Sequence, residues 1–267
     1  MSEVLEEKVL IAGVEGPYRS DAVRIERTER RVRTYFAGHL IADSRRVLLV
    51  YEPRRLPVYW FPTQDVQMDY LTPAQHTLEG DDSATTARWD LELEGQSAEN
   101  AAWSYPHPDS ERAGLRDHVA IYWNKMDAWY EEDEEVFVHP RDPYYRVDVL
   151  NSSRHVKVVV DGEVLAETRR PRLLFETGLP TRYYIPKLDV RMELLEATEK
   201  ITSCPYKGLA SYWSARVGDR LLEDLVWSYP APIPECPKIE NLLSFYNEKV
   251  DIYVDGELQP RPRTQWS

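Results

Sequence analysis

The strongest constraint on this chain is an internal repeat, because residues of its first half return 124 positions later in the second. Two Trp-Ser-Tyr-Pro blocks, at 103–106 and 227–230, keep this offset, and Tyr-Trp-Asn at 122–124 matches Phe-Tyr-Asn at 245–247 after a shift of one residue. Other matched positions are Gly38/Gly162, Ala42/Ala166, Arg45/Arg169, Arg46/Arg170, Leu49/Leu173, Glu52/Glu176, Tyr59/Tyr183, Pro62/Pro186, Asp65/Asp189 and Trp89/Trp213. One offset held over so many positions indicates a tandem duplication.

The repeat length predicts two whole domains rather than solenoid units, since about 100–150 residues is the common domain size. We expect an N-terminal extension over residues 1–29, a first repeat over 30–143 and a second over 154–267. Turn-forming residues between Pro140 and Ser153 predict a linker, with its core at 144–153.

Each repeat shows the alternation of β-strands, which begins at residues 31–36. The Ala37-Gly38 pair predicts a turn. Asp-Gly pairs at 161–162 and 255–256 predict tight hairpins, because Asp and Gly tolerate positive φ. A short helix is expected after Pro62 and after Pro186, where Leu188, Met192 and Leu195 would share a face. A second is expected over 237–243. The fold class is therefore mainly β, with a folded sheet or half-open barrel per repeat and one or two short helices.

Composition limits the classes of partner. The net charge of −13 over 267 residues disfavours nucleic acid and anionic membranes, which attract clustered Lys and Arg. The two cysteines exclude a disulfide framework and a four-thiolate zinc site. An acidic start without an apolar run shows no signal peptide, and no stretch reaches the length of a membrane span. These features predict an acidic, soluble, cytoplasmic protein of open oligomeric state.

Three segments together resemble the domain of unknown function 427 family in a two-copy form. They are residues 204–213 (CPYKGLASYW), the two Trp-Ser-Tyr-Pro blocks, and residues 245–247 leading to 254–257. The resemblance covers roughly residues 30–263 and includes the turns Tyr-Pro-x-Pro at 105–108 and 229–232. It implies a compact folded-sheet domain similar to the β-tent. Relatives of that fold hold zinc between Cys-x-x-Cys knuckles, which this sequence lacks. Some classifications give the family a nucleotidyltransferase-like label, although no glycine-rich phosphate loop is present.

The two repeats differ at the segment that carries the reactive side chains. Cys204, Tyr206, Lys207 and Gly208 correspond to Gly80, Asp82, Ser83 and Ala84 in the first repeat. The first repeat keeps its tryptophans but lacks the thiol and the amine. A site, if there is one, is expected in the second repeat.

Cys204 and Lys207 are the candidate catalytic residues. A nearby ammonium favours the thiolate form of a cysteine. A catalytic cysteine usually has a histidine base, however, and His155 is the single histidine of the second repeat. The alternative is that Cys204 is a small buried apolar residue while Lys207 pairs with a carboxylate.

Aromatic residues of the second repeat are the candidate pocket walls, since small-molecule sites are commonly lined by aromatic side chains. The candidates are Tyr183, Tyr184, Tyr206, Tyr212, Trp213, Trp227 and Tyr229. Many strand aromatics are simply core, and Trp213 and Trp227, which match Trp89 and Trp103, are the strongest examples. The predicted ligand-binding set is Tyr184, Tyr206, Lys207, Tyr212, Trp213 and Tyr229.

The arginine pairs at 45–46 and 169–170 could clamp an anion, but ordinary salt bridges are favoured. The acidic run at 131–135 is interpreted as a solvated loop. The six histidines have no ligand spacing, so we expect no metal and no cofactor.

Three functions follow as hypotheses. The leading one is a protein that binds a small molecule, partly aromatic or apolar, in an aromatic-lined pocket of the second repeat. The alternatives are a transferase or hydrolase using Lys207 and Cys204, and a structural or protein-interaction module.

Overall fold

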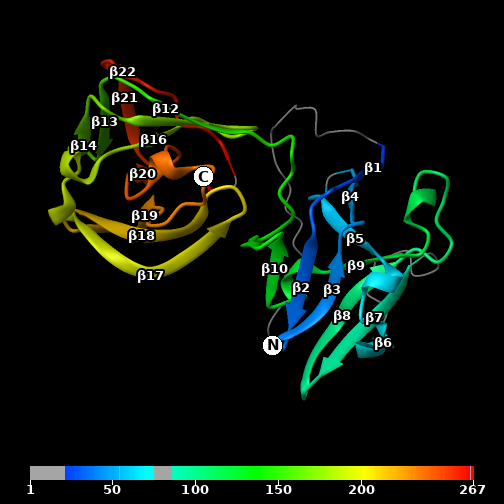
Figure 1. Cartoon of the computed structure of the whole chain (residues 1–267). Helices are drawn as coiled ribbons and strands as arrows, with labels where there is room; N and C mark the ends of the chain where they lie inside the picture. Colours follow the sequence, from blue (N-terminus) through cyan, green and yellow to red (C-terminus); the bar gives the residue numbers. More distant parts are fainter. Residues whose placement is uncertain (1–21, 54, 75–85, 265) are drawn as a thin grey trace. The chain divides into compact units, whose positions relative to one another are not determined.

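A computed structural model describes residues 22–53, 55–74, 86–264 and 266–267, and it divides the chain into two compact units. The first unit ends at Pro140 and the second begins at Arg141. Both units consist of antiparallel strands and short 3-10 turns (Figure 1). None of the sheets formed by the described residues closes into a barrel. The prediction of a mainly β fold in two copies is confirmed. Within the described residues no helix is long and apolar enough to span a membrane.

The first unit contains a seven-stranded and a four-stranded sheet, in the orders β1-β4-β5-β9-β8-β7-β6 and β11-β10-β2-β3. Its strands are β1 (Arg24–Arg27), β2 (Val32–Phe36), β3 (His39–Ser44), β4 (Leu48–Tyr51), β5 (Val58–Pro62), β6 (Leu71–Pro73), β7 (Ala87–Leu93), β8 (Gln96–Ser104), β9 (His118–Ile121), β10 (Ala128–Glu131) and β11 (Glu134–Glu135). Its 3-10 turns are η1 (Thr63–Asp65), η2 (Met68–Tyr70), η3 (Ala113–Leu115) and η4 (Trp123–Lys125).

The second unit repeats this plan, with sheet orders β12-β15-β16, β17-β18-β19-β20 and β14-β13-β21-β22. A single bridge between Ile185 and Leu243 connects the first two of these sheets. The strands are β12 (Val147–Asn151), β13 (Val156–Val160), β14 (Glu163–Thr168), β15 (Arg172–Glu176), β16 (Arg182–Tyr184), β17 (Leu195–Cys204), β18 (Gly208–Val217), β19 (Arg220–Ser228), β20 (Leu243–Phe245), β21 (Asp251–Val254) and β22 (Glu257–Leu258). The 3-10 turns are η5 (Lys187–Asp189), η6 (Met192–Leu194) and η7 (Pro237–Ile239).

In the structure, the 124-residue offset extends further along the chain than the sequence match suggested. Tyr122 donates its backbone N–H to Ala101, as Tyr246 does to Leu225, at 2.9 and 3.2 Å. Tyr122 is therefore the counterpart of Tyr246, and the predicted match to Phe245 was wrong by one residue. The shift falls in the following turn, because β10 and β21 start 123 positions apart.

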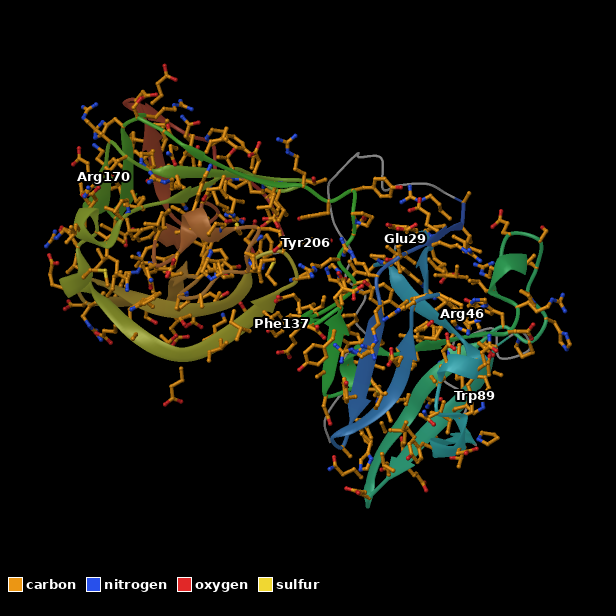
Figure 2. All side chains as sticks on the ribbon, in the orientation of Figure 1. Glu29, Arg46, Trp89, Phe137, Arg170 and Tyr206 are labelled. Carbon is orange, nitrogen blue, oxygen red and sulfur yellow. The ribbon has the colours of Figure 1, made fainter. Side chains whose placement is uncertain are left out.

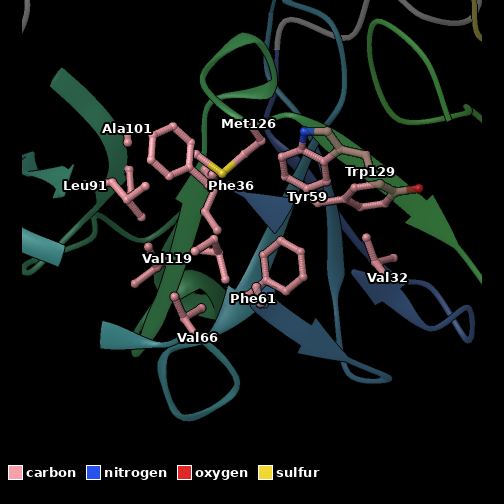
Figure 3. Packing of buried hydrophobic residues seen from close by; sticks show 14 of the residues in the cluster. Val32, Phe36, Tyr59, Phe61, Val66, Leu91, Ala101, Val119, Met126 and Trp129 are labelled. Atoms are coloured by element: carbon pink, nitrogen blue, oxygen red, sulfur yellow. The ribbon is translucent and has the colours of Figure 1, made fainter. Parts of the chain in front are cut away.

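Each unit has two cores. They lie on opposite faces of the strands that contribute to both, because successive strand side chains point to opposite faces. The major core of the first unit includes Val32, Tyr59, Phe61, Met126 and Trp129 (Figure 3). The residues of its smaller core, here called the minor core, are Leu48, Val50, Trp60, Trp103, Leu115 and Ala120. The minor core of the second unit consists of Val149, Leu174, Tyr184, Ala210, Tyr212, Trp227, Tyr229, Cys236 and Ile239.

The predicted helices are replaced by single 3-10 turns. The segment after Pro186 forms η5 and η6, which are separated by two non-helical residues, Val190 and Arg191. Leu188 is 90% exposed, so the apolar spacing that suggested a helix does not mark a buried face. Only the first half of the helix expected at 237–243 forms, as η7.

The repeats also begin earlier than predicted. β1, within the predicted extension, pairs with β4, and β12, within the predicted linker, pairs with β15. Both are short strands at the edge of a sheet, and the sequence analysis did not predict them. The predicted hairpin turns are confirmed by positive φ angles at Ala37-Gly38, Asp161-Gly162 and Asp255-Gly256. Residues 1–21 of the predicted N-terminal extension lie outside the described residues.

Candidate functional site

Cys204 and Lys207 lie on opposite sides of the turn that joins β17 to β18. Cys204 pairs with Gly208 across this hairpin. Gly208 has φ of +99°, and a Cβ there would lie 3.4 Å from both the Ala231 oxygen and the Ile233 nitrogen. Glycine is favoured because an L side chain is strained in this left-handed conformation, while the Cβ itself would just reach van der Waals contact with residues 231–233. The Tyr-Pro-x-Pro turn thus packs against the hairpin turn.

Lys207 points inward and forms an ion pair with Glu176. Its ammonium donates to Glu176 Oε1 at 2.5 Å, and the two side chains are 9% and 5% exposed. The Tyr145 hydroxyl donates to the same oxygen at 3.1 Å. Glu176 is the final residue of β15, so the pair joins the end of that strand to the β17–β18 turn. The predicted alternative, that Lys207 pairs with a carboxylate, is therefore what the structure shows.

The environment keeps Lys207 protonated. Burial is the largest single influence and would lower the pKa of Lys207. The charge of Glu176, together with Cys204, Tyr184 and the hydrogen bond to Glu176, outweighs it and raises this pKa well above its ordinary value. An amine must lose its proton to act as a nucleophile or a base. Lys207 is thus suited to hold a fixed positive charge and not to attack a substrate.

Tyr206, at the tip of the turn, is half-buried and stacks on Tyr145. Their ring centroids are 4.2 Å apart and the rings are inclined by 13°. The Tyr206 hydroxyl accepts a hydrogen bond from the backbone N–H of Asp142 at 3.0 Å. Residues 142–145 were assigned to the end of the first repeat and to the linker, but they belong to the second unit and form one wall of the site.

The predicted aromatic set is divided between two faces of the sheet. Tyr184, Tyr212 and Tyr229 lie in the minor core, all less than 9% exposed. Trp213 instead packs against the major core, as period-two alternation along β18 requires. The structure therefore does not bring Trp213 together with the other five residues. The expectation that Trp227 is a core residue is confirmed, and its indole N–H donates to the Tyr184 hydroxyl at 3.1 Å.

Burial holds two hydroxyls and one thiol of this region, those of Tyr184, Tyr229 and Cys236, in their neutral forms. Burial raises the pKa of Tyr184 and of Tyr229. Burial also raises the pKa of the Cys236 thiol to about 11. Cys204, in contrast, is half-buried and packs against the rim of the minor core. Both cysteines are free thiols.

The first repeat satisfies the equivalent carboxylate in another way. Glu52 Oε1 accepts from Arg112 Nε at 3.0 Å and from the Tyr105 hydroxyl at 3.3 Å. Arg112 is the counterpart of Cys236, not of Lys207, and its side chain is 26% exposed. The counterparts of Cys204, Tyr206, Lys207 and Gly208, namely Gly80, Asp82, Ser83 and Ala84, lie outside the described residues.

The second arginine of each predicted pair forms a salt bridge. Arg46 pairs with Asp65 at 2.6 Å and Arg170 with Asp189 at 3.0 Å, which confirms the favoured interpretation for these two residues. The acidic run is not wholly solvated, since Glu131 is buried and bonded to Arg30 and Tyr59. Glu131 is the last residue of β10, and its side chain points into the first unit.

Sequence reasoning missed Glu176 and Tyr145 as site residues. Glu176 had a signal, because Glu52 matches it across the repeat. A carboxylate present in both copies, at the end of β15 and directly after β4, needs a counter-charge in both. No sequence signal pointed to Tyr145, because the predicted domain boundary placed it in the linker, outside the second repeat.

A family model described as a domain of unknown function (DUF427) matches residues 24–132 and 148–256. The chain belongs to this family. The two matches confirm the predicted tandem organisation, and their starting points agree with β1 and β12 as the first strands of the copies. No curated protein matches the chain.

Proposed function

We propose that this member of the domain of unknown function 427 family binds a small molecule at the β17–β18 turn of its second repeat. The observation that carries this proposal is the hydrogen bonding of Lys207. An ammonium has three N–H donors, yet within the described part of the chain Glu176 is the sole acceptor for it. A buried donor without a partner is costly. A ligand oxygen at this position would satisfy it.

The surroundings favour a ligand with an aromatic or apolar body. The stacked rings of Tyr145 and Tyr206 and the side chain of Cys204 provide flat, weakly polar surface above the ion pair. Glu176 balances the charge of Lys207, so the site does not demand an anion. A neutral carbonyl, amide or hydroxyl oxygen on an aromatic body fits this combination.

An enzyme remains the second candidate, because Cys204 is a half-buried thiol on the same turn as a fixed ammonium. Cys204 would then be the nucleophile of a transferase or hydrolase, and Lys207 would stabilise charge. The free thiols suit a reducing compartment, and we propose a cytoplasmic location on that basis.

A thermal-shift titration with matched benzoates and benzamides tests the proposal. A compound at 100 times its Kd is expected to stabilise the protein by about 2.7 kcal/mol. Tyr206→Ala should abolish the shift, while Tyr253→Ala, at another half-buried tyrosine of the second unit, should leave it unchanged. A flat response to both series, or a response that survives Tyr206→Ala, would contradict binding at this turn.

A further inference from the structure

A separate polar hollow of about 380 Å³ lies on the second unit. Arg170, in its lining, and Tyr206, at the proposed binding turn, lie on opposite sides of that unit (Figure 2). The lining residues are His155, Glu167, Thr168, Arg169, Arg170 and Asp189. The hollow is therefore distinct from the site around Lys207.

One acid of the hollow is fully engaged by its neighbours. Asp189 accepts from Arg170 through both carboxylate oxygens, at 3.0 and 3.1 Å, and from the Thr168 hydroxyl at 2.6 Å. The Thr168 hydroxyl in turn accepts from the backbone N–H of Arg170 at 3.1 Å. These contacts fix Arg170 in place and balance the Asp189 charge.

The second acid is also engaged. Glu167 contacts the His155 ring at 2.7 Å, and the backbone N–H of His155 is held by Asp255 at 2.9 Å. Arg169 differs from all of these, since its guanidinium is exposed and has no hydrogen bond or ion pair to any residue that the structure describes. The acids are paired, and one cation in the hollow is not.

The same six positions carry the same kinds of side chain in the first repeat. They are Arg31, Asp43, Ser44, Arg45, Arg46 and Asp65. Arg31 pairs with Asp43 and Arg46 with Asp65, and Ser44 donates to Asp65 at 2.6 Å. These contacts account for five of the six residues in each repeat. They do not explain the exposed arginines, Arg45 and Arg169, which occur at the same place in both copies.

A guanidinium binds phosphate oxygens in a bidentate manner, and the guanidinium of Arg169 is the one in this hollow that no carboxylate of the described residues already occupies. We propose that the hollow binds the phosphate group of a small molecule through Arg169, with the neutral Arg170–Asp189 pair beside it. The net charge of −13 opposes the approach of an anion. Binding should therefore become weaker as the compound carries more negative charge in addition to its phosphate group.

Titration of the full chain with inorganic phosphate at constant ionic strength tests the inference, followed by NMR of backbone amides and arginine Nε groups. Saturable shifts are expected at Arg169 and at residues 167–170. Arg169→Gln should weaken binding at least tenfold. Arg216→Gln removes the same charge from an exposed pair on β18 and should change the affinity by less than twofold.

Three results would overturn the inference. These are shifts that rise linearly with phosphate concentration, an affinity that Arg169→Gln leaves intact, and an equal loss in both variants. None of them bears on the proposed site at the β17–β18 turn, because Lys207 and Tyr206 are unchanged throughout.

Discussion

The two minor cores occupy equivalent places in the repeats but are built from different chemistry. In the first, Trp60 stacks on Tyr105 with centroids 5.2 Å apart, and the counter-charge of Glu52 comes from Arg112 at the rim. In the second, Tyr184 stands where Trp60 does, and its hydroxyl lies in the core. The cation there is Lys207, which is buried.

The difference shows how one scaffold can lose or keep a polar site. Both copies carry a glutamate at this strand end, Glu176 as the last residue of β15 and Glu52 directly after β4, so both must supply a cation. In the first repeat the cation is Arg112, directly before η3; its guanidinium is partly exposed, and the indole of Trp60 fills the core. In the second repeat the cation is Lys207 of the β17–β18 turn; its ammonium is buried, and the thiol of Cys204 on the same turn lies at the rim of the core.

The largest expected effect is alkaline destabilisation of the second repeat. The pKa values of Tyr184, Tyr229 and Lys207 are raised by the fold, so the folded state binds more protons than the unfolded state above pH 10. The stability from these groups is complete below their ordinary pKa values and falls above them, by about 1.4 kcal/mol per pH unit for each group. Denaturant unfolding at pH 8 to 11.5, monitored by methyl NMR of Ile239, measures it.

Of these three groups the first repeat keeps only a tyrosine, Tyr105, because Trp60 and Ser83 stand where Tyr184 and Lys207 do. Tyr184→Phe should accordingly make the loss in the second repeat shallower. If the free energy of unfolding falls between pH 10 and 11.5 with the same slope in Tyr184→Phe, Tyr184 does not contribute to the alkaline destabilisation.

The next effect is that of Lys207→Met, which leaves the Glu176 carboxylate buried beside an apolar side chain. Breaking a buried pair in this way costs about 3–5 kcal/mol. The double variant Lys207→Met, Glu176→Leu should recover most of that loss, since neither charge remains. Urea unfolding of the three proteins decides the point. A loss below 1 kcal/mol in the single variant would mean that the pair contributes little.

Gly208→Ala should destabilise the protein by about 1–3 kcal/mol, because alanine is strained at φ of +99°. The first repeat has Ala84 at this position. The same substitution should also reduce protection of the Ile233 N–H, which donates to the Lys207 oxygen at 3.1 Å, in hydrogen exchange. Unchanged stability and protection would show that the turn does not depend on glycine.

The smallest effect is expected for Arg112→Gln. The ion pair with Glu52 is partly exposed, and Glu52 also accepts from Arg55, so its loss should cost about 1 kcal/mol. Comparison with Lys207→Met under the same conditions ranks the two counter-charges. Equal losses would contradict the view that the first repeat keeps its cation at the rim.

Local rules predicted the local features. The Asp161-Gly162 hairpin and the duplicated strands follow from turn chemistry and alternation. Alternation would also have separated Tyr212 from Trp213, which belong to opposite faces of one strand. The partner of Lys207 could not be predicted in this way, because Glu176 lies on another sheet and only the packing of the whole repeat brings the two together. The helix prediction was wrong at Leu188. Its spacing from Met192 and Leu195 suggested a shared buried face, but the Leu188 side chain faces solvent.

The most direct test is a map of backbone amide shifts while an aromatic amide such as benzamide is titrated into the full chain. The account predicts saturable shifts at residues 204–208 and at Glu176, with none at Arg112 or Glu52. Shifts confined to the first repeat, or spread over both without saturation, would contradict the claim that the second repeat alone retains a binding site in its minor core.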